Sequence, residues 1–207
     1  ALLWFLTFKK DLEAIGFVFN PYDPCVANCK VNGKQQTICF HVDDLKSSHV
    51  DPEVNTRSEA WLQKQYGKHK KLEAQWGDKH KCLGMILDYS EKGKVKIDMR
   101  RYVSDMIDDF PLKLGVNNNS LYPAAEDLFG QPKKDTTKLD KQVAEGFHST
   151  VAKGLFLSKR GQPDIQPTIA YLCTRVQGPT QTDWKKLVKL MKFLNGSKED
   201  VLTLSAD

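Results

Sequence analysis

Two adjacent carboxylates, Asp43 and Asp44, are the residues whose types and spacing could do chemistry. They interrupt the strand-like stretch ICFHVDDLKSSH, which begins at Ile38. Neighbouring negative charges repel unless a turn exposes them or a cation neutralises them. Because successive side chains of a strand point to opposite faces, both carboxylates can approach one cation only at a tight turn between antiparallel strands. The pattern therefore predicts a hairpin with two carboxylates at its tip.

Such a tip suits a hard cation. Mg²⁺ prefers oxygen ligands and commonly uses one or two carboxylates together with substrate phosphates. Two such ions can activate an attacking hydroxyl and stabilise a leaving pyrophosphate in phosphoryl transfer. An ordinary Asp-Asp turn remains the alternative for the dipeptide alone. A zinc site made of Cys25, Cys29, Cys39 and His41 is also conceivable, but the strand-like context favours half-buried thiols.

The elements that must position these carboxylates follow from periodicity and turn residues. Residues 1–16 repeat apolar side chains at helical spacing and end at Gly16, which predicts a helix. Residues 25–42 read as two strands around Asn32-Gly33, a pair that favours a type I′ hairpin. The other expected elements, in chain order, are a third strand to about Val50, a helix over 51–66 begun by Asp51-Pro52, a hairpin with arms 83–89 and 95–99, a helix over 101–110, three helices over 145–159, 164–176 (capped by Asp164) and 183–194, and a strand over 201–206.

Two segments show no regular pattern. Residues 67–81 are polar and rich in lysine, and residues 112–143 read as a linker. Strands with helices come first and a block of helices follows, which predicts an α+β architecture with an appended helical subdomain.

Composition narrows the class of protein. The chain has 207 residues, 40% of them apolar, which is enough for a substantial core. It has no apolar run near the roughly 20 residues that span a bilayer, so no membrane partner is expected. Five cysteines without regular spacing fit reduced thiols in an intracellular, cytoplasmic protein.

The net charge of +5 is concentrated in residues 144–197, which hold eight basic and three acidic residues. In the last predicted helix, Lys185, Lys189 and Lys192 form one face beside the apolar face that contains Trp184. A local positive bias suggests a polyanionic partner. On charge alone, a solvated lysine face is the simpler explanation.

Several motifs together resemble the reverse transcriptases of Ty1/copia-type retrotransposons. ICFHVDDLKSSH resembles their aromatic-x-Asp-Asp hairpin, and LEAIGFVFNPYDPCVAN is similar to the segment before it. HKCLGMILDYSEKGKVKIDMRRYVSDMI resembles their Leu-Gly-Met hairpin and first thumb helix. FHSTVAKGLFLSKRGQPDIQPTIAYL, followed by DWKKLVKLMKFLNGS, is similar to their helical region. The motifs occur in the family's order over nearly the whole chain.

The resemblance implies part of a right-hand polymerase that copies RNA into DNA with Mg²⁺ (or Mn²⁺) and dNTPs. Residues 1–99 would be the C-terminal part of the palm, an antiparallel sheet with helices. Residues 100–143 would be a short helix and a linker, residues 144–197 an α-helical thumb-like subdomain, and residues 198–207 a strand leading toward an RNase H domain.

The resemblance also assigns site residues. Asp43 and Asp44 would be the catalytic metal ligands. The primer and template, RNA or DNA with a DNA primer, would contact His41, Leu83, Gly84, Met85, Trp184, Lys185, Lys189 and Lys192. The other expected partners are the remaining parts of the Pol polyprotein, namely integrase, fingers and RNase H, within a virus-like particle.

Three positions depart from the family pattern. His41 and Cys82 each stand where the family has Tyr. Gln162 stands where the family has Arg. Nothing in residues 1–37 matches the family's third palm carboxylate or its fingers, so the isolated chain is expected to be inactive. Two alternatives remain open. One is a non-catalytic nucleic-acid-binding remnant, and the other is an unrelated protein-interaction domain that uses the amphipathic helix 183–194.

Overall fold

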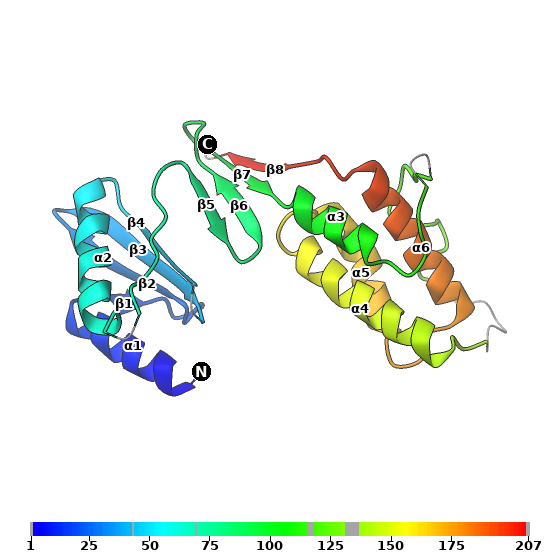
Figure 1. The fold of residues 1–207 in the computed structure, drawn as a ribbon, viewed down its shortest axis with the longest axis horizontal. Helices are drawn as coiled ribbons and strands as arrows, with labels where there is room; N and C mark the ends of the chain where they lie inside the picture. The colour runs from blue at the N-terminus through cyan, green and yellow to red at the C-terminus, as the bar shows by residue number, and fades with distance from the viewer. Residues whose placement is uncertain (1, 43, 69, 116–117, 131–136, 206–207) are drawn as a thin grey trace. The chain divides into compact units, whose positions relative to one another are not determined.

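The computed structural model describes residues 2–42, 44–68, 70–115, 118–130 and 137–205 (Figure 1). The described residues form a mixed α+β protein with six α-helices and two antiparallel four-stranded sheets. The chain divides into two compact units, Ala1–Trp76 and Gly77–Asp207, so the segment 1–99 expected from the sequence is split by this boundary. Within the described ranges, no helix combines the length and apolar character needed to cross a bilayer.

In the first unit, two helices pack on one face of a sheet with strand order β1-β2-β3-β4 (Figure 1). The elements are α1 (Leu2–Ala14), β1 (Val18–Phe19), β2 (Val26–Val31), β3 (Lys34–His41), β4 (Asp44–Ser48) and α2 (Pro52–Tyr66). The strands and helices expected for this part of the chain are confirmed.

Local signals explain where these elements begin and end. Gly16, with φ of +93°, follows the end of α1. Asn32 and Gly33 both have positive φ, 50° and 75°, as a type I′ turn between β2 and β3 requires. The Asp51 carboxylate accepts a hydrogen bond from the Glu53 backbone N–H at 2.9 Å and so caps α2.

Phe40 is the centre of the first unit's core. Its ring meets Phe8 edge-on at 5.0 Å between centroids, and the rings of Trp4, Phe5 and Phe19 lie 6.0–6.3 Å away. These rings come from α1, β1 and β3, so one strand residue ties the helix to the sheet. Aromatic pairs at such separations add about 0.5–1.5 kcal/mol each beyond area burial.

The second unit joins a small sheet, with strand order β5-β6-β7-β8, to a helical bundle. Its core is built mainly from helical residues, among them Val151, Phe147 and Leu190. The elements are β5 (Lys79–Cys82), β6 (Met85–Asp88), β7 (Lys94–Asp98), α3 (Arg100–Asp108), α4 (Lys141–Ser158), the 3₁₀ turn η1 (Pro163–Ile165), α5 (Gln166–Cys173), α6 (Gln181–Gly196) and β8 (Leu202–Ser205).

The sequence prediction for the start of this unit was partly wrong. The polar segment 67–81 ends in a strand, β5, which pairs antiparallel with β6. Leu83 and Gly84 were expected in a strand arm, but they form the two-residue turn between β5 and β6 with φ of 49° and 75°. Charged residues such as Lys79 and Lys81 concealed the strand, because β5 lies at the sheet edge and needs no continuous apolar pattern.

Two further expectations need correction. The predicted linker 112–143 ends earlier, since α4 begins at Lys141, and it is anchored by the buried Leu128 and Leu139. Asp164 does not occupy the N-cap of a helix. It lies inside η1, and α5 follows directly from Ile165. A proline at each start, Pro163 and Pro167, divides the expected single helix into these two pieces.

We expect Phe40→Ala to lower the free energy of unfolding by about 3–5 kcal/mol, because it removes the ring at the centre of the aromatic cluster. His41→Ala should change it by less than about 0.5 kcal/mol, since His41 is exposed on the opposite face. Urea unfolding followed by tryptophan fluorescence measures both. Equal losses in the two variants would contradict the register of β3.

The β6 carboxylate of Asp88 should titrate at unusually low pH. It accepts a hydrogen bond from the Ser90 hydroxyl and pairs with Lys79 across the strands, and this lowers its pKa to about 2. Carbon-detected NMR titration should find that midpoint, and Ser90→Ala should move it up toward 3.8. Because the folded pKa is depressed, the stabilisation is present above the ordinary pKa and is lost as the pH falls from about 4 to about 2. A wild-type midpoint near 3.8 would contradict these contacts.

Candidate functional site

The β3–β4 hairpin ends in the predicted tight turn. His41 pairs with Asp44 across the two strands, which leaves only positions 42 and 43 between them. Val42 has φ of +51°, in the left-handed region that β-branched residues seldom adopt. A positive φ is what a two-residue type I′ hairpin demands at its first central position. The hairpin therefore places a strained residue at its tip, and such strain costs on the order of 1–3 kcal/mol.

Asp44 lies at the first position of β4 and is exposed. Asp43, the other predicted catalytic and metal-binding residue, lies outside the described residues. Because paired residues share a face, Asp44 and His41 lie on the same side of the sheet, together with the pair of Cys39 and Lys46. This side is opposite the helices, since the alternate residues Gln36, Ile38 and Phe40 are buried against the core.

The described residues at this tip offer one carboxylate, from Asp44, and one imidazole, from His41. A single exposed carboxylate with a neighbouring imidazole suits a cation that takes its other ligands from substrate or water, as Mg²⁺ does. No three His, Cys, Asp or Glu side chains within the described ranges come together as a metal-binding group. The suggested zinc ligands are separated by strand alternation, because Cys29 contacts the core whereas Cys39 and His41 face outward.

Cys39 is a poor nucleophile in this position. Although the side chain is exposed on the sheet surface, partial desolvation by its neighbours raises the pKa of its thiol, and Lys46 on the neighbouring strand only partly offsets that effect. At neutral pH the side chain is therefore a protonated thiol, and a thiol is a much weaker nucleophile than a thiolate.

In the second unit, Leu83 and Gly84 form a hairpin tip and Met85 begins β6. Met85 packs against the core of the helical bundle, which ties the hairpin to the helices. The turn itself presents Gly84 to solvent. These three predicted contact residues thus occupy one hairpin tip.

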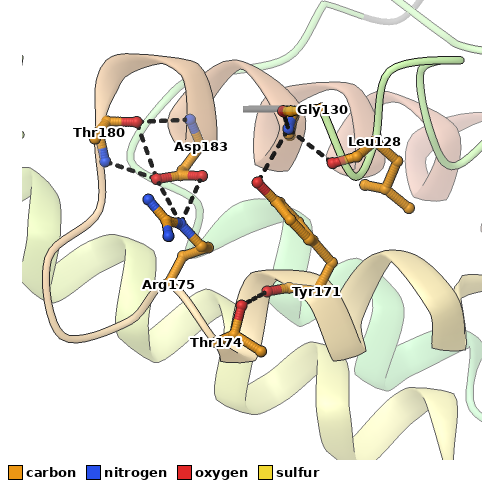
Figure 2. Close-up of polar contacts among 8 residues, drawn as sticks. Leu128, Gly130, Tyr171, Thr174, Arg175, Thr180 and Asp183 are labelled. Carbon is orange, nitrogen blue, oxygen red and sulfur yellow. Dashed lines mark hydrogen bonds and ion pairs between the residues drawn. The ribbon is translucent and has the colours of Figure 1, made fainter. Parts of the chain in front are cut away.

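The start of α6 is fixed by a buried polar network (Figure 2). The Thr180 hydroxyl caps the helix by accepting from the Asp183 N–H, and the Asp183 carboxylate accepts from the Thr180 N–H at 2.9 Å. Arg175 donates to both carboxylate oxygens at 3.2 and 3.3 Å. This capping box with a bridging arginine holds the beginning of α6 against the end of α5.

Lys186 belongs to the core, although the adjacent Lys185 is exposed. It is 6% exposed, and its ammonium donates to the carbonyls of Leu128 and Gly130 and to the Tyr171 hydroxyl. The sequence reasoning missed this role. Helical spacing was the sequence signal for its burial, because Lys186 lies on the same helical face as the buried residues Asp183, Leu187, Leu190, Met191 and Leu194.

Four predicted contact residues, Trp184, Lys185, Lys189 and Lys192, line one groove of about 540 Å³ with Val188, Asn119 and Ser120. Asn119 and Ser120 are held against α6 by hydrogen bonds. The Ser120 N–H donates to the Lys192 carbonyl, and the Asn195 side-chain amide donates to the Asn119 side-chain oxygen.

The charges and the ring in this groove remain available to a ligand. Among the described residues, none of the three lysines forms an ion pair. The Trp184 ring is stacked on Phe110 with centroids 5.3 Å apart, which fixes its orientation while the ring stays half-buried. The groove therefore combines fixed aromatic surface with three cations that no described carboxylate pairs with.

No protein family, curated protein or solved structure that was compared matches this chain. Function therefore rests on the geometry of the hairpin tip and the groove.

We expect Lys186→Met to lower the free energy of unfolding by about 2 kcal/mol, because the carbonyls of Leu128 and Gly130 lose a charged donor. The adjacent Lys185→Met is the matched control and should change it by less than about 0.5 kcal/mol. Thermal unfolding followed by circular dichroism compares them. Equal effects would show that the faces of α6 are wrongly assigned.

Proposed function

We propose that this chain is the palm and thumb part of a Ty1/copia-type reverse transcriptase, with its metal-binding carboxylates at the β3–β4 tip. The observation that carries the proposal is the pairing of His41 with Asp44, on a sheet face that the unit's helices leave open. A polymerase needs its carboxylates where a primer end and a nucleotide can reach them. The exposed position of Asp44 meets that need.

Mg²⁺ bound with Asp43 and Asp44 would activate the primer hydroxyl and stabilise the leaving pyrophosphate. The residues of the chain would supply metal ligands, a hydrogen-bonding group and structural support. Asp44 offers carboxylate oxygens at the start of β4, and His41 lies beside it as a hydrogen-bonding group. The Phe40 cluster holds the tip in place from behind the sheet.

The α6 groove supports the nucleic-acid part of the proposal. Backbone phosphates supply most of the sequence-independent affinity of proteins for nucleic acids, and Lys185, Lys189 and Lys192 are placed to contact them. Trp184 offers aromatic surface that needs no particular base. The Leu83-Gly84 tip, with Met85 behind it, is the proposed primer-side contact.

A second candidate is a nucleic-acid-binding protein without catalysis. It is favoured by the groove alone, because the three lysines would bind phosphates whether or not the hairpin tip binds a metal. The two candidates differ in whether Mg²⁺ changes the binding.

Binding of a fluorescein-labelled DNA primer annealed to an RNA template tests the proposal by anisotropy. We expect affinity to fall steeply with salt, and the double variant K185Q/K189Q should reduce the slope of log K against log salt by about 2. The charge-matched control is K94Q/K96Q, because both of those lysines are already paired with Glu91. Weak salt dependence, or equal effects of the two double variants, would favour the protein-interaction alternative.

The same assay separates catalysis from simple binding. Polymerase function predicts that Mg²⁺ increases the affinity for primer–template, and that Asp43→Asn combined with Asp44→Asn removes the increase without changing the salt slope. Binding indifferent to Mg²⁺ in the wild-type chain would leave only the non-catalytic candidate.

A further inference from the structure

The first unit contains a cavity of about 310 Å³ between α2 and the β2–β3 hairpin. It lies on the helix-covered side of the sheet, because Ile38 and Gln36 of its lining are buried there and Cys29 contacts the core. Its volume is at the lower end of the range for small-molecule sites. Phe17 and Trp61 supply aromatic walls.

The cavity exists because small or polar side chains occupy positions where larger apolar side chains would fill the space of a packed core. The face of α2 that lines it repeats at helical spacing and presents Ser58 between Val54 and Trp61. Opposite this face stands Gln36, 3% exposed, on β3. Compact cores leave few such spaces, so a hollow lined partly by polar groups is a candidate binding site.

The hydrogen bonds of Gln36 leave one acceptor available. Its amide nitrogen donates to Ser47 and Ser58 at 3.0 and 2.6 Å, which uses both N–H groups. Among the described residues, its carbonyl oxygen accepts only from the Cys29 thiol at 3.7 Å. Burial raises the pKa of Cys29, so that thiol stays protonated, but S–H is a weak donor. The Gln36 oxygen can therefore accept a stronger N–H or O–H donor from a ligand.

The only charged side chain in the described lining is Arg57, at an exposed position on α2. Within the described ranges it forms no ion pair, not even with Glu53 one helical turn earlier. A guanidinium at the edge of an apolar cavity selects an anionic group, and its planar fork fits a carboxylate.

We propose that this cavity binds a small aromatic carboxylate that also carries an N–H or O–H donor. The ring lies between Phe17 and Trp61, the carboxylate pairs with Arg57, and the donor reaches the Gln36 oxygen. The site is separate from the hairpin tip, because it lies on the other side of the sheet.

Indole-3-propionate is the probe, because it carries one carboxylate and one ring N–H. Titration into the ¹⁵N-labelled chain, followed by NMR, should shift the Gln36 side-chain amide and the Trp61 indole signals saturably. Indole-3-propionamide should bind about tenfold more weakly, since it lacks the charge that Arg57 selects. Methylating the indole nitrogen should weaken binding severalfold, because it removes the donor to Gln36.

Matched variants assign the selectivity to Arg57. Arg57→Gln should weaken binding of the propionate about tenfold and leave the propionamide unchanged, while Arg57→Lys keeps most of the preference. Lys64→Gln, an exposed cation later on α2, should change neither. The proposal is overturned if the shifts are not saturable or map outside the cavity, if wild type binds acid and amide equally, or if Lys64→Gln weakens binding as much as Arg57→Gln.

Discussion

The burial of Phe40 governs the geometry of the first unit. Its ring is enclosed by four others, from α1 and β1, which sets which face of β3 is inside. Because strand side chains alternate, a one-residue slip would expose Phe40 and bury His41. The same register aligns His41 with Asp44 and leaves two residues for the turn. The exposed carboxylate and the strained Val42 are therefore consequences of how the aromatic core packs.

The second unit has a comparable constraint at the beginning of α6. The Thr180–Asp183 capping box and Arg175 fix where the helix starts, and this sets the direction of every later side chain. Lys186 then points inward to the carbonyls of Leu128 and Gly130, while Lys185 stays exposed. Two adjacent lysines thus have opposite roles, one in stability and one at the surface of the groove.

How much could be predicted from the sequence depended on whether the signal was local. The Asn32-Gly33 turn and the Asp51-Pro52 helix start were correct, because each is determined by a few neighbouring residues. β5 was missed, since an edge strand with alternating lysines has no apolar pattern to detect. The Leu83-Gly84 turn was read as strand because leucine seldom adopts positive φ.

The candidate site, like the fold, could be predicted from the sequence only where its signal was local. Adjacent carboxylates between strand-like arms correctly indicated a tight turn before Asp44. Lys186 could not be recognised as buried from its residue type, because lysine is buried only when tertiary contacts such as the Tyr171 hydroxyl satisfy it. The cavity beside Gln36 was also invisible, since it depends on segments that meet only in the fold.

The central claim is that the β3–β4 tip binds a divalent cation through its carboxylates. Mn²⁺ broadens the NMR signals of nuclei near its binding site, so adding it to the ¹⁵N-labelled chain tests the claim directly. We expect the amide signals of His41, Val42 and Leu45 to broaden first, and Asp44→Asn to abolish that broadening. Broadening that begins elsewhere, or that survives both Asp43→Asn and Asp44→Asn, would contradict the proposed metal site.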